Sequence, residues 1–536
     1  MSRYEFEQKS PSNSNVEFSE RITPLPEQKE KVRDIPVTIV IPPSPFLADE
    51  RVFPFLGPLK VAAELSKNGN QTNVLDLSGY SNYLDIVRQY ANENQDAVYG
   101  ITATTPQIPT AASITQAIKD VSSQSTVILG GPHATLTHAA FTEDAKTGRK
   151  GRGTHAFMQL TNLFDRIVSG DGEESIFYAI DPDQTQQVID SSTTKSPLFL
   201  QKGTLESFEH PARHLIDLDS YHYSIDGRRA FSVIGQLGCP FECGFCGGRD
   251  SQVFRIARTR DINDVIREIE SVVTPSLDTD TPYGGVMFYD DELNVSPSNL
   301  EKLCTGLIDM QDRLGHEMRF RGFVKAELFT PEQARLMYQA GFKILLSGVE
   351  SGSDRILSVM KKHTSRAINS RCVETAHNAG LSFKALMSIG HPGESETTIG
   401  ESIEWVTNNL SVGDDVDWTI ITQYPGSPYF DHSVYVPEKN AWLYEMKNKK
   451  NGEVARLWSS EVDYLKEANY YKGVPGKYTA FVWTDYLNAQ ELVQLREIAE
   501  GYTREKLQLN QIGHNRLQQF EHSMGQSLPS QILKRG

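Results

Sequence analysis

The chain has 536 residues, enough for two or three domains with cores of their own. It carries 53 Lys and Arg against 69 Asp and Glu, a formal net charge of −16. This balance argues against a nucleic-acid partner, because phosphate contacts need clustered basic side chains. No stretch approaches the roughly 20 apolar residues of a transmembrane helix, so we expect no membrane span.

The first 34 residues differ in composition from those that follow. They are rich in Ser, Asn, Pro and Glu and contain no apolar run, so they cannot bury enough apolar surface to fold by themselves. We therefore expect residues 1–34 to form a disordered tail, and neither a signal peptide nor a membrane anchor.

Residues 35–200 alternate between short apolar runs and amphipathic stretches. The run at 36–41 is continuously β-branched or apolar, as a strand buried on both faces would be. Strands that alternate with helices predict a doubly wound, Rossmann-like parallel sheet, whose ligand lies beyond the carboxyl ends of the strands. The expected strands are 36–41, 72–77, 97–103, 126–131 and one within 164–177, and the expected helices are 57–69, 82–93 and 107–121.

The carboxyl ends of these strands are rich in Gly, Pro, Ser and Thr. They read PPSP at 42–45, TATTPQIP at 102–109, GGPHAT at 130–135 and GDGEE at 170–174. Such residues let the backbone approach a bulky polar ligand closely, although ordinary turns have the same composition. The polar stretch 143–162 predicts an irregular surface loop or a lid over this site.

A second alternating segment, residues 201–430, follows a linker near 182–212. Its strand and helix pairs predict a partial (β/α)6 barrel of the TIM type, with chemistry at the carboxyl ends of its strands. The expected strands are 230–236, 284–289, 318–324, 343–349, 383–389 and 417–422, and the expected helices are 261–273, 297–314, 331–340, 364–379 and 396–409. Beyond residue 430 the pattern weakens and aromatic residues cluster, so we expect a small C-terminal α+β domain over 431–536, with a helix at 489–507.

Three of the five cysteines lie directly after the first expected barrel strand, at Cys239, Cys243 and Cys246. Zinc would need a fourth protein ligand, and none lies nearby in the sequence. A redox dithiol would use Cys243 and Cys246 and leave Cys239 unexplained. An iron–sulfur cluster on three thiolates keeps one iron free for a ligand, and the spacing favours this third assignment. Cys304 and Cys372 lie in helical patterns and are expected in the core.

With Phe245 before its last cysteine, this Cys-x3-Cys-x2-Cys motif resembles that of the radical S-adenosylmethionine (SAM) superfamily. Four later segments resemble the family's second, fourth, fifth and sixth strand motifs: FYDDELN at 288–294, GVESGSDRIL at 348–357, MSIGHPGES at 387–395 and TQYPGSPYF at 422–430. The resemblance implies a 4Fe–4S cluster on the three cysteines, with SAM bound to its free iron. The SAM-binding residues that we expect are Phe245, Asp290, Asp291, Glu292, Glu350, Ser351 and Arg321.

The N-terminal segment in turn resembles the cobalamin-binding domain that precedes the barrel in many radical SAM enzymes. The motif Asp-x-His-x-x-Gly, which supplies a histidine ligand to cobalt, is absent, so cobalamin is expected to bind base-off with no histidine on the metal. Asp171 stands where the family's signature loop usually has Glu, and the 143–162 insertion has no counterpart there. The residues implied to contact cobalamin are Thr102, Thr104, Thr105, Gly130, Gly131, Pro132, His133, Gly170, Gly172 and Glu173.

Together these resemblances imply an enzyme that methylates an unactivated carbon or phosphorus centre of a small-molecule or natural-product substrate. The cofactors carry the reaction, so no side chain is singled out as catalytic. Two alternatives stay open: cyclisation or rearrangement with the same cofactors and no methyl transfer, and a non-catalytic cobalamin or iron–sulfur sensor. An external electron donor of the flavodoxin or ferredoxin type is also implied. Because the thiolates need a reducing compartment, we expect a cytoplasmic protein.

Overall fold

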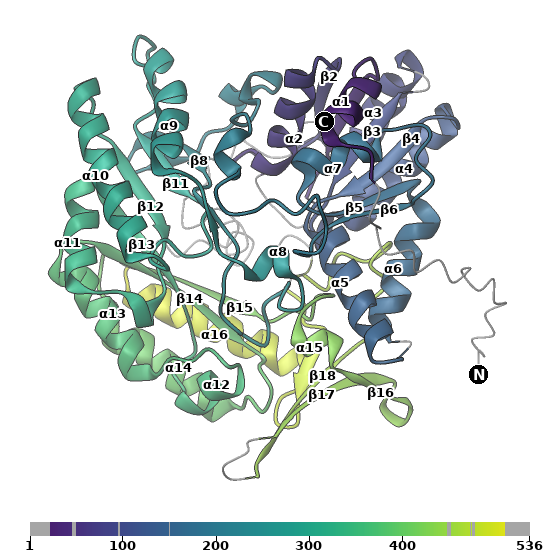
Figure 1. Cartoon of the computed structure of the whole chain (residues 1–536). Coiled ribbons are helices and arrows are strands. Elements are labelled where there is room, and N and C mark those ends of the chain that lie inside the picture. Colours follow the sequence, from purple (N-terminus) through teal and green to yellow (C-terminus); the bar gives the residue numbers. More distant parts are fainter. Residues whose placement is uncertain are drawn as a thin grey trace.

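The chain folds into three successive bodies: a parallel sheet covered by helices, an open barrel and a small antiparallel sheet (Figure 1). The computed structural model describes residues 22–44, 50–94, 97–149, 151–447, 452–471, 473 and 478–509. The expectations for residues 1–21 and 510–536 lie outside these residues. The predicted α/β class, with a doubly wound sheet followed by a partial barrel and a small α+β part, is confirmed.

The N-terminal body is built on a six-stranded sheet in the order β2-β1-β3-β4-β5-β6, with every neighbouring pair parallel. The strands are β1 (Val37–Ile41), β2 (Thr72–Asp76), β3 (Val98–Thr102), β4 (Thr126–Gly130), β5 (Arg166–Gly170) and β6 (Val188–Ser191). All five residues of β1 are buried, as in a strand covered on both faces. The strand order reverses between β1 and β3, the position at which doubly wound sheets bind ligands.

Helices cover both faces of this sheet. They are α1 (Leu25–Lys31), α2 (Leu56–Asn68), α3 (Tyr83–Glu93), α4 (Ile108–Val121), α5 (Pro132–Lys146), α6 (Arg152–Leu163) and α7 (Gly172–Ala179). On one face, Ile39 and Val98 pack with residues of α2 and α7. On the other, Val40 and Tyr99 pack with residues of α3, α4 and α6. Successive strand residues thus enter opposite cores, because side chains alternate along a strand.

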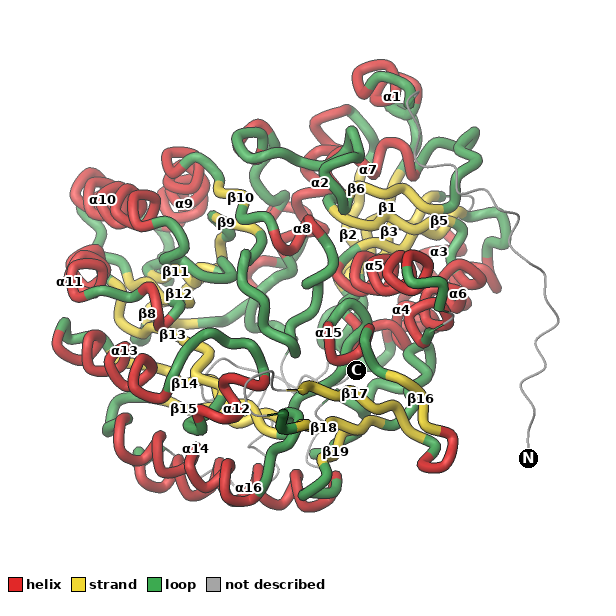
Figure 2. The backbone as a smooth tube through the Cα atoms, turned by 60° about the horizontal axis from the view of Figure 1, so that its bottom comes forward, coloured by secondary structure: helices red, strands yellow, loops and turns green. Residues whose placement is uncertain are grey.

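The barrel consists of six parallel strands, with a short antiparallel strand added at one edge, in the order β15-β14-β13-β12-β11-β8-β7. The strands are β7 (Ser224–Ile225), β8 (Arg228–Val233), β11 (Gly285–Phe288), β12 (Arg319–Phe323), β13 (Phe342–Glu350), β14 (Ser382–Ile389) and β15 (Asp415–Ile420). The helices are α9 (Ile262–Ser276), α10 (Pro297–Leu314), α11 (Pro331–Ala340), α12 (Asp354–Val359), α13 (Arg366–Asn378) and α14 (Glu396–Asn409). They lie outside the curved sheet, so its concave side turns toward the N-terminal body (Figures 1 and 2).

The C-terminal body combines a four-stranded antiparallel sheet with one long helix. The elements are β16 (Val434–Val436), β17 (Ala441–Lys447), β18 (Val454–Ser459), β19 (Val482–Thr484) and α16 (Ala489–Lys506). Helix α16 packs against β15: the Trp418 backbone N–H donates to Glu500 Oε2 at 3.0 Å, and the Trp418 indole donates to Thr503 Oγ1 at 3.0 Å. The helix thereby covers the outer strand of the open barrel (Figure 2).

Three local expectations need correction. Residues 25–31 of the expected tail form α1, and the Gln28 amide donates to the Phe177 carbonyl at 3.0 Å, so the packed chain begins before Ile35. The expected linker contributes β6 to the first sheet. The stretch 143–162 is mostly helical, because it holds the end of α5 and most of α6, whose residues Ala156 and Leu160 are buried.

Four short elements lie between the bodies. Strand β9 (Gln236–Leu237) pairs with β10 (Arg258–Thr259), and α8 (Gln252–Arg255) lies between the two larger bodies in both views (Figures 1 and 2). Helix α15 (Pro428–Asp431) follows the last barrel strand. Within the described ranges, no helix has the length and apolarity needed to cross a membrane.

Candidate functional site

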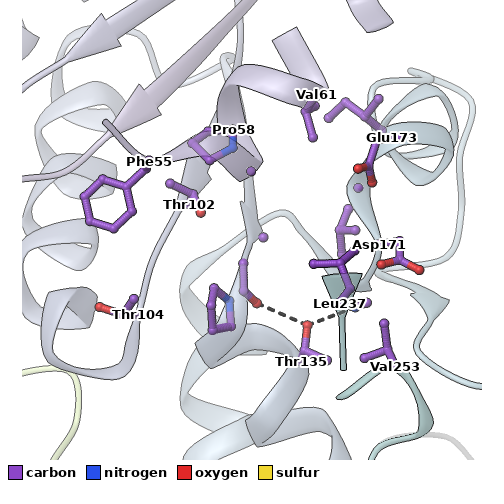
Figure 3. A pocket seen from close by; sticks show the side chains of 18 of the residues that line it. Phe55, Pro58, Val61, Thr102, Thr104, Thr135, Asp171, Glu173, Leu237 and Val253 are labelled. Carbon is purple, nitrogen blue, oxygen red and sulfur yellow. Dashed lines mark hydrogen bonds between the residues drawn. The ribbon is translucent and has the colours of Figure 1, made fainter. Parts of the chain in front are cut away.

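A cavity of about 420 Å³ lies at the carboxyl edge of the first sheet, where this sheet faces the barrel (Figure 3). Its floor is formed by the ends of β1, β3, β4 and β5, and its rim by the starts of α2, α5 and α7. Thr135 joins two parts of the rim, because its hydroxyl donates to the Gly131 carbonyl at 3.1 Å and accepts from the Gly170 N–H at 2.9 Å.

Eight of the ten predicted cobalamin residues line this cavity: Thr102, Thr104, Gly130, Gly131, Pro132, Gly170, Gly172 and Glu173. Thr105 and His133 do not. They lie behind the wall and contact each other, with His133 Nδ1 3.1 Å from Thr105 Oγ1. His133 Nε2 lies 3.2 Å from Thr137 Oγ1, and burial lowers the pKa of His133 to about 3. Both ring nitrogens are therefore engaged inside the N-terminal body.

The opposite wall of the cavity comes from the barrel, and of its residues only Asp291 is among the predicted site residues. Gln236, Leu237 and Gly238 directly precede Cys239, and Tyr289 and Asp291 belong to the acidic segment after β11. Helix α2 and the linking elements supply further lining residues, Phe55, Pro58, Val61, Val253, Phe254 and Arg258. One cavity thus contacts both the glycine-rich strand ends and the start of the cysteine loop.

The glycine-rich strand ends that line the cavity pack closely against one another. Gly131 has φ +91°, and a Cβ there would lie 2.6 Å from Thr102 Oγ1, so a side chain has no room. The volume suits one arm of cobalamin. The cavity-lining strand-end residues would hold that arm.

Cys239, Cys243 and Cys246 are half-buried in the loop from Gly238 to Asp250, which we call the cluster loop. Gly238 has φ +81°, and a Cβ there would lie 2.3 Å from the Ile256 carbonyl oxygen. This position therefore needs glycine, and its close approach brings the chain back against α8 just before Cys239.

Backbone hydrogen bonds hold the cluster loop from three sides. Cys239 N–H donates to the Phe254 carbonyl at 2.8 Å, Gly244 N–H to Met360 at 2.8 Å, and Gly248 N–H to Gly426 at 2.8 Å. Phe254 lies in α8, Met360 follows the fourth barrel strand and α12, and Gly426 follows the sixth barrel strand. The three thiols are thus placed at the carboxyl ends of the barrel strands, as expected for chemistry in this fold.

The thiols lie in an environment that disfavours free thiolates. Burial raises the pKa of Cys246 to about 11, and it also raises that of Cys239. The buried Arg249 guanidinium partly offsets this, and its Nη1 donates to the Cys239 carbonyl at 2.9 Å and to the Phe241 carbonyl. Thiols of this kind become thiolates when a metal binds them, so the donor set fits an iron–sulfur cluster. No three His, Cys, Asp or Glu side chains of the described residues are grouped for a single metal ion.

Below the cluster loop, Glu350 and Phe245 meet two residues that the sequence patterns missed, Lys362 and His391. The Lys362 ammonium donates to Glu350 Oε1 at 3.1 Å and lies 6.0 Å from the centre of the Phe245 ring. Ser388 donates to Glu350 Oε2 at 2.8 Å and lies 2.7 Å from His391 Nε2. Burial alone would raise the pKa of Glu350, but Lys362 and Ser388 hold it below its usual value. A charged pair therefore stands beside the cluster loop.

Glu292 and Asp291 also remain available to a ligand. Glu292 Oε2 is buried with no hydrogen-bond partner among the described residues, and burial raises the pKa of this carboxyl to about 7. Asp291 lines the cavity. Buried polar atoms are nearly always paired, so the free Glu292 oxygen fits the ammonium group of the methionine part of SAM.

In the structure, the other three predicted SAM-binding residues make hydrogen bonds with groups of the protein. Asp290 Oδ1 accepts from the Gly235 N–H at 2.6 Å. Ser351 is fully buried, and its hydroxyl lies 3.1 Å from Ser402 Oγ. Arg321 Nη1 donates to the Tyr223 hydroxyl at 2.7 Å. Nothing in the sequence motifs distinguishes these residues from Glu292 and Glu350, because their partners lie on distant segments.

Comparisons with known proteins agree with this division. Residues 53–161 match the B12 binding domain family and residues 233–406 match the radical SAM superfamily. An uncharacterized methyltransferase of Pyrococcus horikoshii is 23% identical over 417 residues, covering 74% of this chain and 83% of that protein. The anaerobic magnesium-protoporphyrin IX monomethyl ester cyclase of Rubrivivax gelatinosus is 24% identical over 381 residues, covering 68% of this chain and 63% of that protein.

Among solved structures, the radical SAM methyltransferase TsrM of Kitasatospora setae, with cobalamin and a 4Fe–4S cluster bound, aligns with a TM-score of 0.54. It is 14% identical, and the alignment covers 78% of this chain and 81% of TsrM, so the likeness concerns the fold. The two family matches define the class of protein: a B12-binding domain joined to a radical SAM domain. The chain is a cobalamin-dependent radical SAM enzyme, with SAM, a 4Fe–4S cluster and cobalamin as its cofactors.

Proposed function

We propose that this enzyme transfers a methyl group from SAM, by way of cobalamin, to an unactivated carbon or phosphorus centre of a small-molecule substrate. The observation that carries the proposal is the shared cavity, in which Thr102 and Gly131 of the cobalamin-binding body face Leu237 and Asp291 beside the cluster loop. Methyl transfer through two cofactors requires that both act on one substrate, so their sites must face a common space.

The protein's part in this reaction is binding, orientation and exclusion of water. When bound, the cluster supplies the electron that cleaves SAM, and cobalamin carries the methyl group. Glu292 would hold the ammonium group of the methionine part of SAM. Lys362 would pair with the methionine carboxylate, and Glu350 would hold the Lys362 side chain in place. Phe254 and Tyr289 line the wall between the two sites and would keep water from the radical step.

The experiment is anaerobic incubation of the reconstituted enzyme with SAM deuterated on its methyl group, a reductant of the flavodoxin or ferredoxin type, and candidate substrates. We expect a product that gains three deuteriums, together with S-adenosylhomocysteine and 5′-deoxyadenosine in equal amounts, since one SAM donates methyl and another gives the radical. The matched control is the Cys243→Ala variant, which should form no 5′-deoxyadenosine. Product without deuterium would contradict methyl transfer.

A second candidate is cyclisation without methyl transfer. The likeness to the Rubrivivax cyclase supports it, because that relative is as similar in sequence as the methyltransferase of Pyrococcus. In this case 5′-deoxyadenosine would accumulate with product while S-adenosylhomocysteine stayed absent. The same incubation therefore separates the two candidates.

A further inference from the structure

Asp171 and Arg258 form a buried ion pair between the cobalamin-binding body and the barrel. Arg258 Nη1 lies 2.5 Å from Asp171 Oδ2, and Nη2 lies 3.1 Å from Oδ1, so the contact is bidentate. The side chains are 1% and 8% exposed, and both residues line the cavity between the two bodies. Asp171 precedes α7 in the glycine-rich loop after β5, where the sequence departs from the family's usual Glu.

Arg258 connects this loop to the first cysteine. Its Nη1 also donates to the Leu200 carbonyl at 3.0 Å, and its Nη2 to the Val253 carbonyl at 3.2 Å. Arg258 belongs to β10 and pairs in register with Leu237 of β9. Only Gly238 separates Leu237 from Cys239. A short and hydrogen-bonded path therefore leads from the cobalamin-binding loop to a cluster thiol.

Arg152 of α6 also joins the bodies, with hydrogen bonds to Ser459 Oγ at 3.1 Å and to Gln423 Oε1, but two contacts made by α8 and the cluster loop are less directional. Val253 N–H donates a single bond to the Ser192 carbonyl at 3.0 Å. Leu136 of α5 lies against Gly247, where a Cβ would stand 3.2 Å from the leucine side chain. A bidentate arginine–carboxylate pair fixes the relative orientation of its two partners, which a single hydrogen bond or an apolar contact does not. A buried ion pair adds little net stability compared with an apolar contact at the same place. The Asp171–Arg258 pair therefore differs from such a contact mainly in fixing orientation.

We propose that Asp171 and Arg258 are a positioning pair that fixes the separation and orientation of cobalamin relative to the iron–sulfur cluster. The proposal rests on the proposed function only in that both cofactors act on one substrate. Neither side chain takes part in a chemical step. Asp171 lines the cavity together with the neighbouring Gly172 and Glu173.

The test measures the distance between the two cofactors in the holoenzyme. With cobalamin as cobalt(II) and the cluster reduced, both are paramagnetic, and pulsed electron paramagnetic resonance reports their dipolar coupling. We expect one narrow distance in the wild type. The double variant Asp171→Leu/Arg258→Met removes both charges without leaving either one buried alone, and it should bind both cofactors with a broadened distance distribution. Arg258→Lys keeps the positive charge but cannot make the bidentate contact with Asp171, so it should broaden the distance distribution less than the double variant does.

Lys31→Met is the matched control, because the Lys31–Asp181 pair, at 2.7 Å, lies within the cobalamin-binding body. It should leave the cofactor distance unchanged. A narrow, wild-type distance in the double variant would overturn the proposal. If the double variant fails to bind either cofactor, the distance is measured in Arg258→Lys, and a narrow, wild-type distance in that variant would overturn the proposal. An enzyme that transfers no methyl group would overturn the proposed function and still permit this distance measurement.

Discussion

Lys362 Nζ lies 3.1 Å from Glu350 Oε1 and beside Phe245 of the cluster loop. Glu350 has φ +64°, in the left-handed region that a non-glycine residue rarely adopts and that costs on the order of 1–3 kcal/mol. This conformation ends β13 and lets the Glu350 carboxylate meet both Lys362 and Ser388. Strain of this size at the end of a barrel strand indicates that the position of the carboxylate matters to the site.

Replacing Lys362 by Met should weaken SAM binding. The variant removes the buried cation that we place opposite the methionine carboxylate and leaves Glu350 without its ion pair. We expect a loss of affinity of about tenfold or more, the size of one charge-assisted contact. Calorimetry on reconstituted protein measures it. Lys361→Met is the control, because Lys361 is exposed. Equal effects of the two variants would contradict the assignment.

Asp290→Asn should leave SAM binding nearly unchanged, whereas Glu292→Gln should weaken it. The Asp290 carboxyl already accepts the Gly235 N–H, while Glu292 Oε2 has no described partner. A titration of SAM against both variants measures the difference. A larger loss in Asp290→Asn would show that Asp290, and not Glu292, contacts the ligand.

Asp290 also predicts a pH dependence of stability. Burial raises its pKa from 3.8 to about 7, so between these values the folded protein holds a proton that the unfolded chain has released. The free energy of unfolding therefore falls in this window as pH rises, by at most about 1.4 kcal/mol per pH unit from this group. Denaturant unfolding of the apoprotein near pH 5 and pH 8 should show a smaller fall in Asp290→Asn. The same fall in wild type and variant would exclude this origin.

Alanine at Cys239, Cys243 or Cys246 should abolish the 4Fe–4S cluster, because each thiolate would bind a different iron. Iron and sulfide analysis after anaerobic reconstitution measures the loss. Cys304→Ala and Cys372→Ala serve as controls, since both side chains are buried in the barrel core. They should keep the cluster and lose about 1 kcal/mol of stability. A cluster that survives Cys243→Ala would refute the ligand set.

Cobalamin should bind base-off with no histidine on cobalt. The His133 ring nitrogens contact Thr105 and Thr137, and His138 Nδ1 lies 2.9 Å from Ser169 Oγ. The paramagnetic spectrum of the cobalt(II) form should therefore lack nitrogen hyperfine splitting, in the wild type and in His133→Ala alike. Splitting that disappears in His133→Ala would identify a histidine ligand instead.

Arg249→Met should make the cluster easier to lose and harder to reduce. The buried guanidinium holds the carbonyls of Cys239 and Phe241, and it places a positive charge beside the thiols. Without that charge, the added electron is less stabilised, so the reduction potential becomes more negative. A potentiometric titration measures the shift, and Arg249→Lys should restore part of it. An unchanged potential would show that Arg249 acts only on loop packing.

Local sequence patterns were sufficient for most strands and helices and for the cysteine motif. Strand β1 is a continuous apolar run, and α10 and α14 have apolar residues at helical spacing. Because these patterns lie within each segment, the bounds of the three elements could be predicted closely. The three cysteines are close in sequence, and a tight loop keeps them close in space. The lining of the cavity by the strand ends likewise follows from the parallel order of the strands.

Tertiary structure decided which side chains face the ligands. Asp290 and Glu292 are two residues apart, yet only Asp290 meets the Gly235 N–H, which lies on another strand end. Lys362 follows α12, beyond the end of the motif at 348–357, and reaches back to Glu350. The sequence by itself thus determined the class of the two main domains and the three-cysteine motif, because these depend on short-range spacing. The docking of the two bodies, the second wall of the cavity and the Asp171–Arg258 pair arise from contacts between distant segments, which only the folded chain brings together.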